Sequence, residues 1–220
     1  MYQDSDSIDQ LKQSYLDKKE DIDRRLNYFR SVYNRSDNYI FKELCFCLLT
    51  PQSKARTCDK AIENIYNNNQ LFTATEEEIT DNIRQIRFRN NKAKYIILAR
   101  DLFTDKDTEK ISIKKEIDRF KDNVPELRYY LTENIKGMGM KEASHFLRNI
   151  GKGDDIAILD RHILKNLKKY ELITEIPATI TPKRYIEIEK ITRTFSKDTK
   201  IPMDALDLLF WSNETGEIFK

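Results

Sequence analysis

Glycine and proline are both scarce in this sequence, which has five of each among 220 residues. Folds that contain many β-turns need these residues, and no sustained alternation of apolar and polar residues predicts a strand. No repeating period is visible either, which argues against a solenoid. Apolar residues instead recur at the helical spacing of about 3.6 residues, and we predict an all-α fold.

Cysteine is rare as well, and its number is odd. Cys45, Cys47 and Cys58 are the three cysteines, and they lie in apolar or helical surroundings. Their spacing is not that of zinc or iron–sulfur ligands, and no nearby histidine completes a site. We therefore predict buried, reduced thiols, with no disulfide framework and no metal site.

Long apolar runs and a strong net charge are also missing. No window approaches the about 18 apolar residues of a membrane helix, so the chain is not expected to cross a membrane. The first residues, MYQDSDSIDQLK, lack the basic and apolar regions of a secretion signal, so a cytoplasmic location is the default expectation. With 39 Lys and Arg against 37 Asp and Glu, the net charge is +2, and binding to a polyanion must depend on local patches.

The sequence has enough apolar (39%) and aromatic (10%) residues to form a folded core. No Gly/Ser-rich or Pro-rich linker divides residues 1–220, so we expect one unit of two docked helical lobes without a sharp boundary. The polar stretch from Thr104 to Ser112 reads as a loop between helices. Helices are predicted at Ser7 to Val32, Tyr39 to Leu49, Ala55 to Asn67, Thr75 to Ile86, Lys92 to Leu102, Lys114 to Phe120, Val124 to Ile135, Lys141 to Ile150, Arg161 to Tyr170, Pro182 to Phe195 and Met203 to Ser212.

All glycines but one lie between residues 137 and 153, where the backbone must need unusual freedom. Residues 135–144 read as the end of one helix, a tight turn with Gly137 and Gly139, and the start of a second helix at Lys141. Such a helix-hairpin-helix points backbone amides at an anion and can bind a DNA backbone without reading its sequence. The same pattern also fits a plain αα-hairpin turn.

The residues that follow the hairpin favour an enzyme. Lys141 comes directly after Met140, and Asp160 lies in the run Ile158-Leu159-Asp160-Arg161-His162. This arrangement resembles the helix-hairpin-helix base-excision DNA glycosylases, although the loop at 151–155 lacks their usual proline. The resemblance implies that Lys141 is the nucleophile of a lyase-competent enzyme and that Asp160 is its essential carboxylate. His162 is expected to orient the loop or a phosphate.

Two segments upstream resemble DNA-binding parts of the same superfamily. Gln52 lies in the stretch Cys47-Leu48-Leu49-Thr50-Pro51-Gln52-Ser53, and the resemblance implies that it fills the gap left by a flipped base. Phe88 lies in a stretch rich in Arg and Lys, where an aromatic ring can wedge between bases while Arg87 and Arg89 hold phosphates. The alternatives are that Gln52 is a polar neighbour of a helix end and that Phe88 belongs to the core.

The C-terminal segment from Met203 to Lys220 resembles that of the archaeal-type 8-oxoguanine DNA glycosylase/AP lyases, the second Ogg family. In that pattern Trp211 and Lys220 line the base pocket, where the ring stacks on a flipped purine and the terminal lysine meets polar base edges. Asp204, Asp207 or a backbone carbonyl can read the hydrogen on N7 that distinguishes 8-oxoguanine from guanine. Without the resemblance, Trp211 reads as core and Lys220 as a frayed end.

The resemblance implies a bifunctional DNA repair enzyme with its active site in the cleft between two helical lobes and both chain ends in one lobe. It would excise 8-oxoguanine from double-stranded DNA and nick the abasic strand by β-elimination through a lysine Schiff base. No metal or organic cofactor is expected, although the hairpin can hold a monovalent cation, and the protein is expected to be monomeric. The alternatives are an endonuclease-III-like pyrimidine-damage glycosylase/lyase, a non-catalytic helix-hairpin-helix module, and a helical adaptor.

Overall fold

A computed structural model describes residues 5–220, and the regular elements in this range are all α-helices. The only β-type contact among these residues is an isolated bridge between Thr104 and Ile111, at the two ends of the predicted loop. The all-α prediction is therefore confirmed. The helices are α1 (Ser5–Val32), α2 (Asp37–Leu49), α3 (Ala55–Asn67), α4 (Gln70–Thr73), α5 (Glu76–Asn82), α6 (Arg89–Phe103), α7 (Ile113–Asp118), α8 (Val124–Asn134), α9 (Met140–Asn149), α10 (Arg161–Lys169), α11 (Pro182–Thr199) and α12 (Met203–Thr215).

The predicted helices are all present, and the differences lie at their ends. The short helix α4 was not predicted, because one turn is too short for a periodic pattern. Helix α5 ends at Asn82 instead of continuing to Ile86, and α6 begins at Arg89, earlier than predicted. Helix α12 continues past Ser212 until Gly216, whose φ of 81° ends it in the left-handed conformation that glycine favours.

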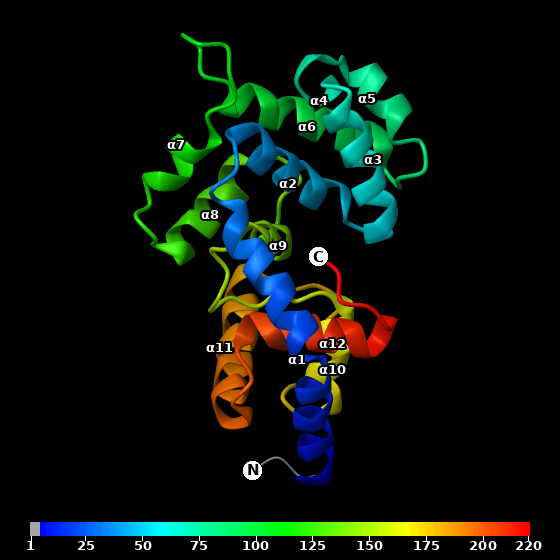
Figure 1. Ribbon diagram of the computed structural model, residues 1–220, viewed down its shortest axis with the longest axis vertical. Helices are drawn as coiled ribbons and strands as arrows, with labels where there is room; N and C mark the ends of the chain where they lie inside the picture. The colour runs from blue at the N-terminus through cyan, green and yellow to red at the C-terminus, as the bar shows by residue number, and fades with distance from the viewer. Residues whose placement is uncertain (1–4) are drawn as a thin grey trace. The chain divides into compact units, whose positions relative to one another are not determined.

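The chain forms two compact units (Figure 1). We call Val32–Ile150 the central unit, which contains α2 to α9. The terminal unit consists of Met1–Ser31 and Gly151–Lys220, and it contains α10 to α12 with nearly all of α1. Each predicted site residue belongs to one of these units.

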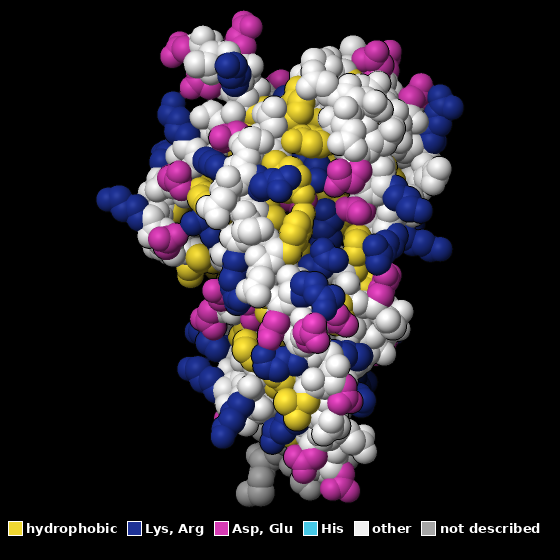
Figure 2. Space-filling model, in the orientation of Figure 1, with side chains coloured by type: hydrophobic (Ala, Val, Ile, Leu, Met, Phe, Trp, Pro, Cys, Tyr) yellow, Lys and Arg dark blue, Asp and Glu magenta, His cyan; other side chains and the backbone are white. Residues whose placement is uncertain are grey.

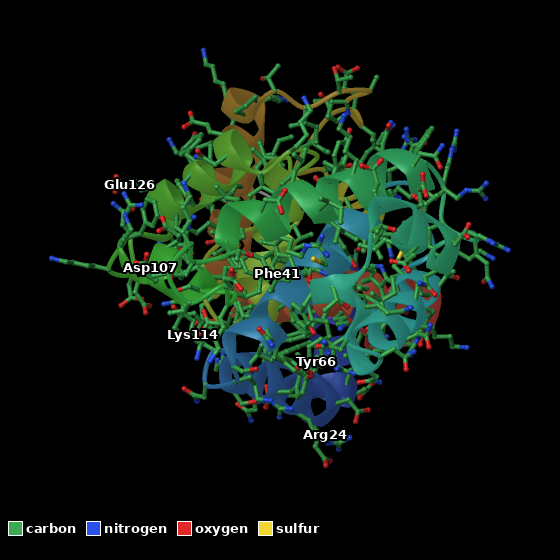
Figure 3. The ribbon with its side chains drawn as sticks, turned by 90° about the horizontal axis from the view of Figure 1, so that it is seen from above. Arg24, Phe41, Tyr66, Asp107, Lys114 and Glu126 are labelled. Carbon is green, nitrogen blue, oxygen red and sulfur yellow. The ribbon has the colours of Figure 1, made fainter. Side chains whose placement is uncertain are left out.

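Helix α2 is the core of the central unit. Its residues from Ile40 to Leu49 are all buried, because the sequence is apolar around nearly the whole helix. It packs against α3, α6, α7 and α9. Phe41, labelled in Figure 3, lies among these helices with its ring centroid 6.3 Å from that of Phe72 and 6.4 Å from that of Phe103.

The terminal unit has an aromatic core between α10, α11 and α12. The ring of Tyr170 stacks on Phe210 at 5.7 Å and lies 5.7 Å from Phe195. Helix α1 is attached to the end of α12, where the Lys18 ammonium donates hydrogen bonds to Ser212 Oγ at 3.0 Å and to Asn213 Oδ1 at 2.6 Å. These contacts join the two ends of the chain within one unit.

The surface carries charges of both signs. On the face shown in Figure 2, Lys and Arg side chains alternate with Asp and Glu over most of the surface. This agrees with the near-neutral net charge. Binding of a polyanion must therefore depend on individual basic groups at a site more than on the electrostatic field of the whole protein. No helix among residues 5–220 is long and apolar enough to span a membrane.

Candidate active site

The hairpin between α8 and α9 depends on close packing at Gly137. The N–H of Met138 donates to the carbonyl of Ile135 at 3.2 Å, which closes the turn. Gly137 has a φ of 86°, and a Cβ added to it would lie 2.2 Å from the ring of Tyr95. No residue other than glycine fits this position without displacing the Tyr95 ring, so the predicted helix-hairpin-helix has a specific packing partner on α6.

Helix α9 begins without a side-chain cap. Gly139 is the N-cap residue, in extended conformation, and its carbonyl accepts from the N–H of Ala143 at 2.9 Å. The first amides of the helix therefore keep their hydrogen-bonding capacity for a ligand, and the helix dipole favours an anion there. The Met140 side chain is only 8% exposed. Met140 can thus contribute its backbone N–H to a phosphate, while its side chain belongs to the core.

Lys141 lies in the first turn of α9, with its side chain 25% exposed. Its Nζ is 3.2 Å from Oε1 of Glu142, which is 14% exposed. The amine is thus partly sheltered, paired with one carboxylate and still accessible. A group with these properties can attack an electrophile once it has lost its proton.

A second lysine lies near Lys141 and is buried. The Nζ of Lys92, at 3% exposure, donates hydrogen bonds to the carbonyls of Leu49 and Pro51, both at 2.7 Å. Burial lowers the pKa of Lys92, and the positive charge of Lys141 acts in the same direction, whereas Cys58 and Glu142 raise it. The burial of Lys92 was not predicted from the sequence, because a lysine on an amphipathic helix is normally exposed.

The three cysteines are buried free thiols, as predicted. The thiol of Cys58 donates to the carbonyl of Leu49 at 3.2 Å, next to the Lys92 ammonium. Burial raises the pKa of Cys58 to about 11, so the group stays a neutral thiol at physiological pH.

The structure brings the two predicted DNA-intercalating segments together in the central unit. Gln52 and Phe88 are both exposed and both adopt the left-handed conformation, with φ of 54° and 59°. Between them, the N–H of Arg87 donates to Ser53 Oγ at 3.2 Å. Left-handed backbone is uncommon for residues other than glycine and occurs often at functional sites.

The Phe88 ring is 51% exposed, so the interpretation of Phe88 as a core residue is wrong. The Arg87 guanidinium lies 4.8 Å from the centroid of this ring, where a cation–π interaction orients both groups. Arg89 is exposed at the first position of α6, and its guanidinium is 3.5 Å from the carbonyl of Arg84. These groups present one aromatic ring and two cations to solvent.

In the terminal unit, Asp160 is the N-cap of α10. Its Oδ1 accepts from the N–H of Ile163 at 2.8 Å, and its carbonyl accepts from Leu164 N–H at 2.9 Å. The carboxylate is partly exposed, and within residues 5–220 its Oδ2 has no hydrogen-bond partner. The geometry thus fixes one oxygen of Asp160 and leaves the other available.

Trp211 is half-buried and lies among other predicted site residues. Its ring centroid is 6.4 Å from that of His162 and 6.4 Å from that of Phe219. The Nδ1 of His162 is 3.9 Å from Oε2 of Glu214, on the same helix as Trp211. The Phe219 side chain is only 4% exposed. Residue 219 is therefore anchored on Trp211, and the half-buried Lys220 that follows it is not a frayed end.

The two acidic candidates on α12 differ in their surroundings. Asp204 is 4% exposed; its Oδ2 accepts from the Arg30 guanidinium at 3.1 Å and its Oδ1 accepts from Ala205 N–H at 2.9 Å. Burial raises the pKa of Asp204, and the negative charge of Asp154 adds to this effect, while Arg30 opposes it. Asp207 is half-buried and lies one helical turn before Trp211, on the same face of α12. Both oxygens of Asp204 are thus engaged within the terminal unit.

Comparisons with known proteins place these features in a family. The sequence profile of the family described as 8-oxoguanine DNA glycosylase matches residues 22–201. An 8-oxoguanine DNA glycosylase/AP lyase of Fusobacterium nucleatum is 44% identical over 214 residues, which are 97% of this chain and 97% of that protein. The crystal structure of the Methanocaldococcus jannaschii 8-oxoguanine DNA glycosylase is similar with a TM-score of 0.86 at 37% identity, covering 97% of this chain and 95% of that one.

A further structure shows the M. jannaschii glycosylase/lyase in complex with 15mer DNA containing 8-oxoguanine. It matches with a TM-score of 0.85 and 36% identity over 96% of this chain and 100% of that chain. An all-α fold with a glycine hairpin and a lysine in the helix that follows it is the arrangement of the helix-hairpin-helix DNA glycosylases. Within that class, this chain belongs to the 8-oxoguanine DNA glycosylase family, which confirms the resemblance found in the sequence.

Proposed function

We propose that this protein excises 8-oxoguanine from double-stranded DNA and cleaves the resulting abasic strand, with Lys141 as nucleophile and Asp160 as the essential carboxylate. The observation that carries this proposal is the position of Lys141, a partly exposed amine in the first turn of a helix whose N-cap is glycine. Relatives whose sequences match this chain over nearly their whole length are named 8-oxoguanine DNA glycosylase/AP lyase.

The chemistry begins with loss of the lesion base. A free lysine amine has a pKa of about 10.4 and is mostly protonated at neutral pH, so its proton must first pass to a base. Asp160 accepts this proton in our proposal. The neutral Nζ of Lys141 then forms a bond to C1′ as the bond from C1′ to N9 breaks, and the base leaves with the electron pair and takes up a proton. Asp160 passes its proton to the departing base, and the carboxylate that this restores stabilises the positive charge that develops on the sugar.

Strand cleavage follows from the same covalent bond. Opening of the sugar ring converts the adduct at C1′ into a protonated Schiff base, which acidifies the hydrogens on C2′. Removal of one of these protons forms a double bond between C2′ and C3′ and expels the 3′ phosphate. Hydrolysis of the Schiff base then returns the free amine of Lys141.

Access to the lesion requires that the base leave the helix stack, at a cost of a few kcal/mol. In our proposal Phe88 inserts between bases, Gln52 fills the vacated position, and Arg87 and Arg89 contact phosphates. The amides that follow Gly139 hold the backbone near the lesion. The exposed positions of Gln52 and Phe88, held together through Ser53, support this role.

The flipped base would lie in the terminal unit. The half-buried Trp211 offers an aromatic surface for stacking a purine, and Lys220 and Asp207 offer a donor and an acceptor to its edge. His162 next to Trp211 can hold a phosphate or orient the Asp160 loop. Guanine lacks the hydrogen on N7, so an acceptor at this position selects the oxidised base.

No step of this mechanism needs a metal or an organic cofactor. A monovalent cation at the hairpin remains a prediction; the Ile135 carbonyl already accepts from Met138, so such a cation would depend on the other carbonyls of the turn. DNA as the substrate and three buried thiols support a cytoplasmic location. A monomeric state also remains a prediction.

Borohydride trapping tests the proposal directly. Labelled duplexes that contain 8-oxoguanine, guanine or dihydrouracil are incubated with the wild type, with Lys141→Gln, and with Lys136→Gln as a control for an exposed lysine of the same hairpin. We expect a covalent adduct on the 8-oxoguanine duplex alone, which Lys141→Gln loses and Lys136→Gln keeps. Trapping by Lys141→Gln would assign the nucleophile to another amine.

The remaining outcomes separate the rival functions. Trapping only on dihydrouracil would indicate an endonuclease-III-like enzyme with the same mechanism but a different pocket. Absence of any adduct, with duplex binding intact, would indicate a non-catalytic helix-hairpin-helix module.

A further inference from the structure

The segment that leads to Asp160 has no regular secondary structure and is buried from Ile156 to Leu159, and side chains of α11 hold it. Tyr185 Oη donates to the Ala157 carbonyl at 2.7 Å and accepts from the Leu159 N–H at 3.1 Å. Glu189 Oε2 accepts from the Ala157 N–H at 2.9 Å. The Arg193 guanidinium donates to both carboxylate oxygens of Asp155 at 2.8 Å and to its carbonyl at 2.7 Å. We call Tyr185, Glu189 and Arg193 the α11 row.

The α11 row lies along one face of its helix, because residues four apart on an α-helix are about 6 Å apart along its axis. The segment turns just before Asp160, where the N–H of Asp160 donates to the Ile158 carbonyl at 2.8 Å. Tyr185 contacts Leu159 and Ala157, Glu189 contacts Ala157, and Arg193 contacts Asp155, so the segment runs antiparallel to α11. These side chains take the place of a neighbouring strand, which this segment lacks in the described part of the chain.

The contacts are strong because most of them are sheltered from water. Tyr185 is 2% exposed and Glu189 is 3% exposed, and Ala157 and Leu159 are each 4% exposed. The bond from an amide to the Glu189 carboxylate is charge-assisted, and Arg193 lies 3.6 Å from the other oxygen of Glu189. Removal of either buried partner leaves backbone groups unsatisfied, which is costly in the interior.

We infer that Tyr185 and Glu189 are positioning residues for Asp160. This inference rests on the proposed role of Asp160 in base release. The last contact of the α11 row, to the Leu159 N–H, lies one residue before Asp160, whose own Oδ1 is then fixed by Ile163. The position of the Asp160 carboxylate is thus set by the contact of α11 with the preceding residue, Leu159, and by its own hydrogen bond from α10. Displacement of a reacting group by about 1 Å can cost 100-fold in rate.

The test compares single-turnover base release from an 8-oxoguanine duplex, duplex affinity and thermal stability. Tyr185→Phe removes the bridging hydroxyl. The matched control is Thr192→Val, which removes another buried hydroxyl of α11 that bonds only within the helix, to the Ile188 carbonyl at 2.9 Å. We expect base release to slow about 10- to 100-fold in Tyr185→Phe, with duplex affinity unchanged, and to stay at the wild-type rate in Thr192→Val. Equal rates in Tyr185→Phe and the wild type would overturn the inference.

Glu189 provides a second test if Tyr185→Phe fails to fold. Glu189→Gln keeps an acceptor for the Ala157 N–H, whereas Glu189→Leu does not. We expect base release to be slow in Glu189→Leu and substantially restored in Glu189→Gln. Slow release in both variants to the same degree would show that the negative charge matters instead of the hydrogen bond, and would contradict the inference.

A double-mutant cycle separates this inference from the proposed function. In an Asp160→Asn background, Tyr185→Phe should have little further effect, because the group that it positions has already lost its function. A full additional loss would show that Tyr185 acts independently of Asp160. If Asp160→Asn alone released the base at the wild-type rate, the proposed role of Asp160 would fail, whatever Tyr185 does.

Discussion

Ser53 Oγ accepts hydrogen bonds both from the Lys92 ammonium, at 3.0 Å, and from the Arg87 N–H, at 3.2 Å. One hydroxyl thus joins the loop that contains Gln52 to the segment that presents Phe88. The same ammonium also holds the carbonyls of Leu49 and Pro51. The two side chains that we propose to enter the DNA stack are therefore parts of one bonded assembly.

Loss of the Lys92 ammonium should destabilise this assembly. Lys92→Met removes one donor from each of three acceptors, of which the Leu49 carbonyl keeps the Cys58 thiol and Ser53 Oγ keeps the Arg87 N–H. We expect the free energy of unfolding to fall by about 2 to 3 kcal/mol, because the partly buried Pro51 carbonyl loses the donor that it has from Lys92. The control is Lys94→Met, an exposed lysine of the same helix, which should change stability by less than about 0.5 kcal/mol. Urea unfolding measures both, and equal stabilities would show that the loop does not depend on Lys92.

Lys92 should also make the free energy of unfolding depend on pH. The pKa of Lys92 is lowered in the folded protein below the 10.5 of the free side chain, chiefly by burial. Between these two pKa values the unfolded chain binds more protons than the folded protein, so stability contributed by this group rises with pH. The difference in unfolding free energy between wild type and Lys92→Met should be constant below the lowered pKa and grow through this window. A flat difference up to pH 10.5 would contradict the assignment.

Asp160→Asn separates catalysis from folding. Asparagine is as good an N-cap as aspartate, so α10 should keep its start and the melting temperature should change little. The negative charge is lost, and we expect single-turnover base release to slow by about 100-fold or more. Measurement of strand cleavage on a preformed abasic site shows whether the lyase step depends on the same group. An unchanged rate of base release would remove Asp160 from the mechanism.

Phe88→Ala should affect lesion extrusion and not folding. The ring is 51% exposed, so its loss should cost less than about 0.5 kcal/mol of stability. We expect excision from a fully paired duplex to slow about 10-fold, and excision from a mismatched site, where extrusion is easier, to slow less. Leu98→Ala, which truncates an exposed apolar side chain within α6, is the control and should leave both rates unchanged. Equal effects on both substrates would argue against a wedge.

Deletion of Lys220 should reduce the discrimination between 8-oxoguanine and guanine more than it reduces the affinity for DNA. We expect the preference for 8-oxoguanine over guanine to fall by about 10-fold, because a polar contact to the base edge is lost. Lys183→Ala removes the same charge from an exposed site on α11 and should leave the preference unchanged. Competition binding with matched duplexes measures both quantities. Equal losses on damaged and undamaged DNA would reduce Lys220 to a general electrostatic contact.

The helices and the hairpin could be predicted because their signals are local. Apolar periodicity located the long helices, and the glycines located the turn at Gly137. The left-handed conformations of Gln52 and Phe88 could not be predicted, because neither residue type favours them. The burial of Lys92 and the contacts of Tyr185 with the Asp160 segment depend on partners far away in the sequence. Such contacts produce no periodic pattern in the sequence. The only hint is that Tyr185, Glu189 and Arg193 are spaced four apart, as residues on one face of a helix are.

The contact between Tyr95 and Gly137 has a mechanical consequence. Tyr95 belongs to α6, which begins directly after Phe88, and Gly137 lies in the turn just before Lys141. Because the ring leaves no room for a Cβ at Gly137, the start of α6 and the turn before Lys141 are coupled by direct packing. In our proposal these two places carry the wedge and the nucleophile, so a side chain added at Gly137 would disturb both groups at once, although they are far apart in the sequence.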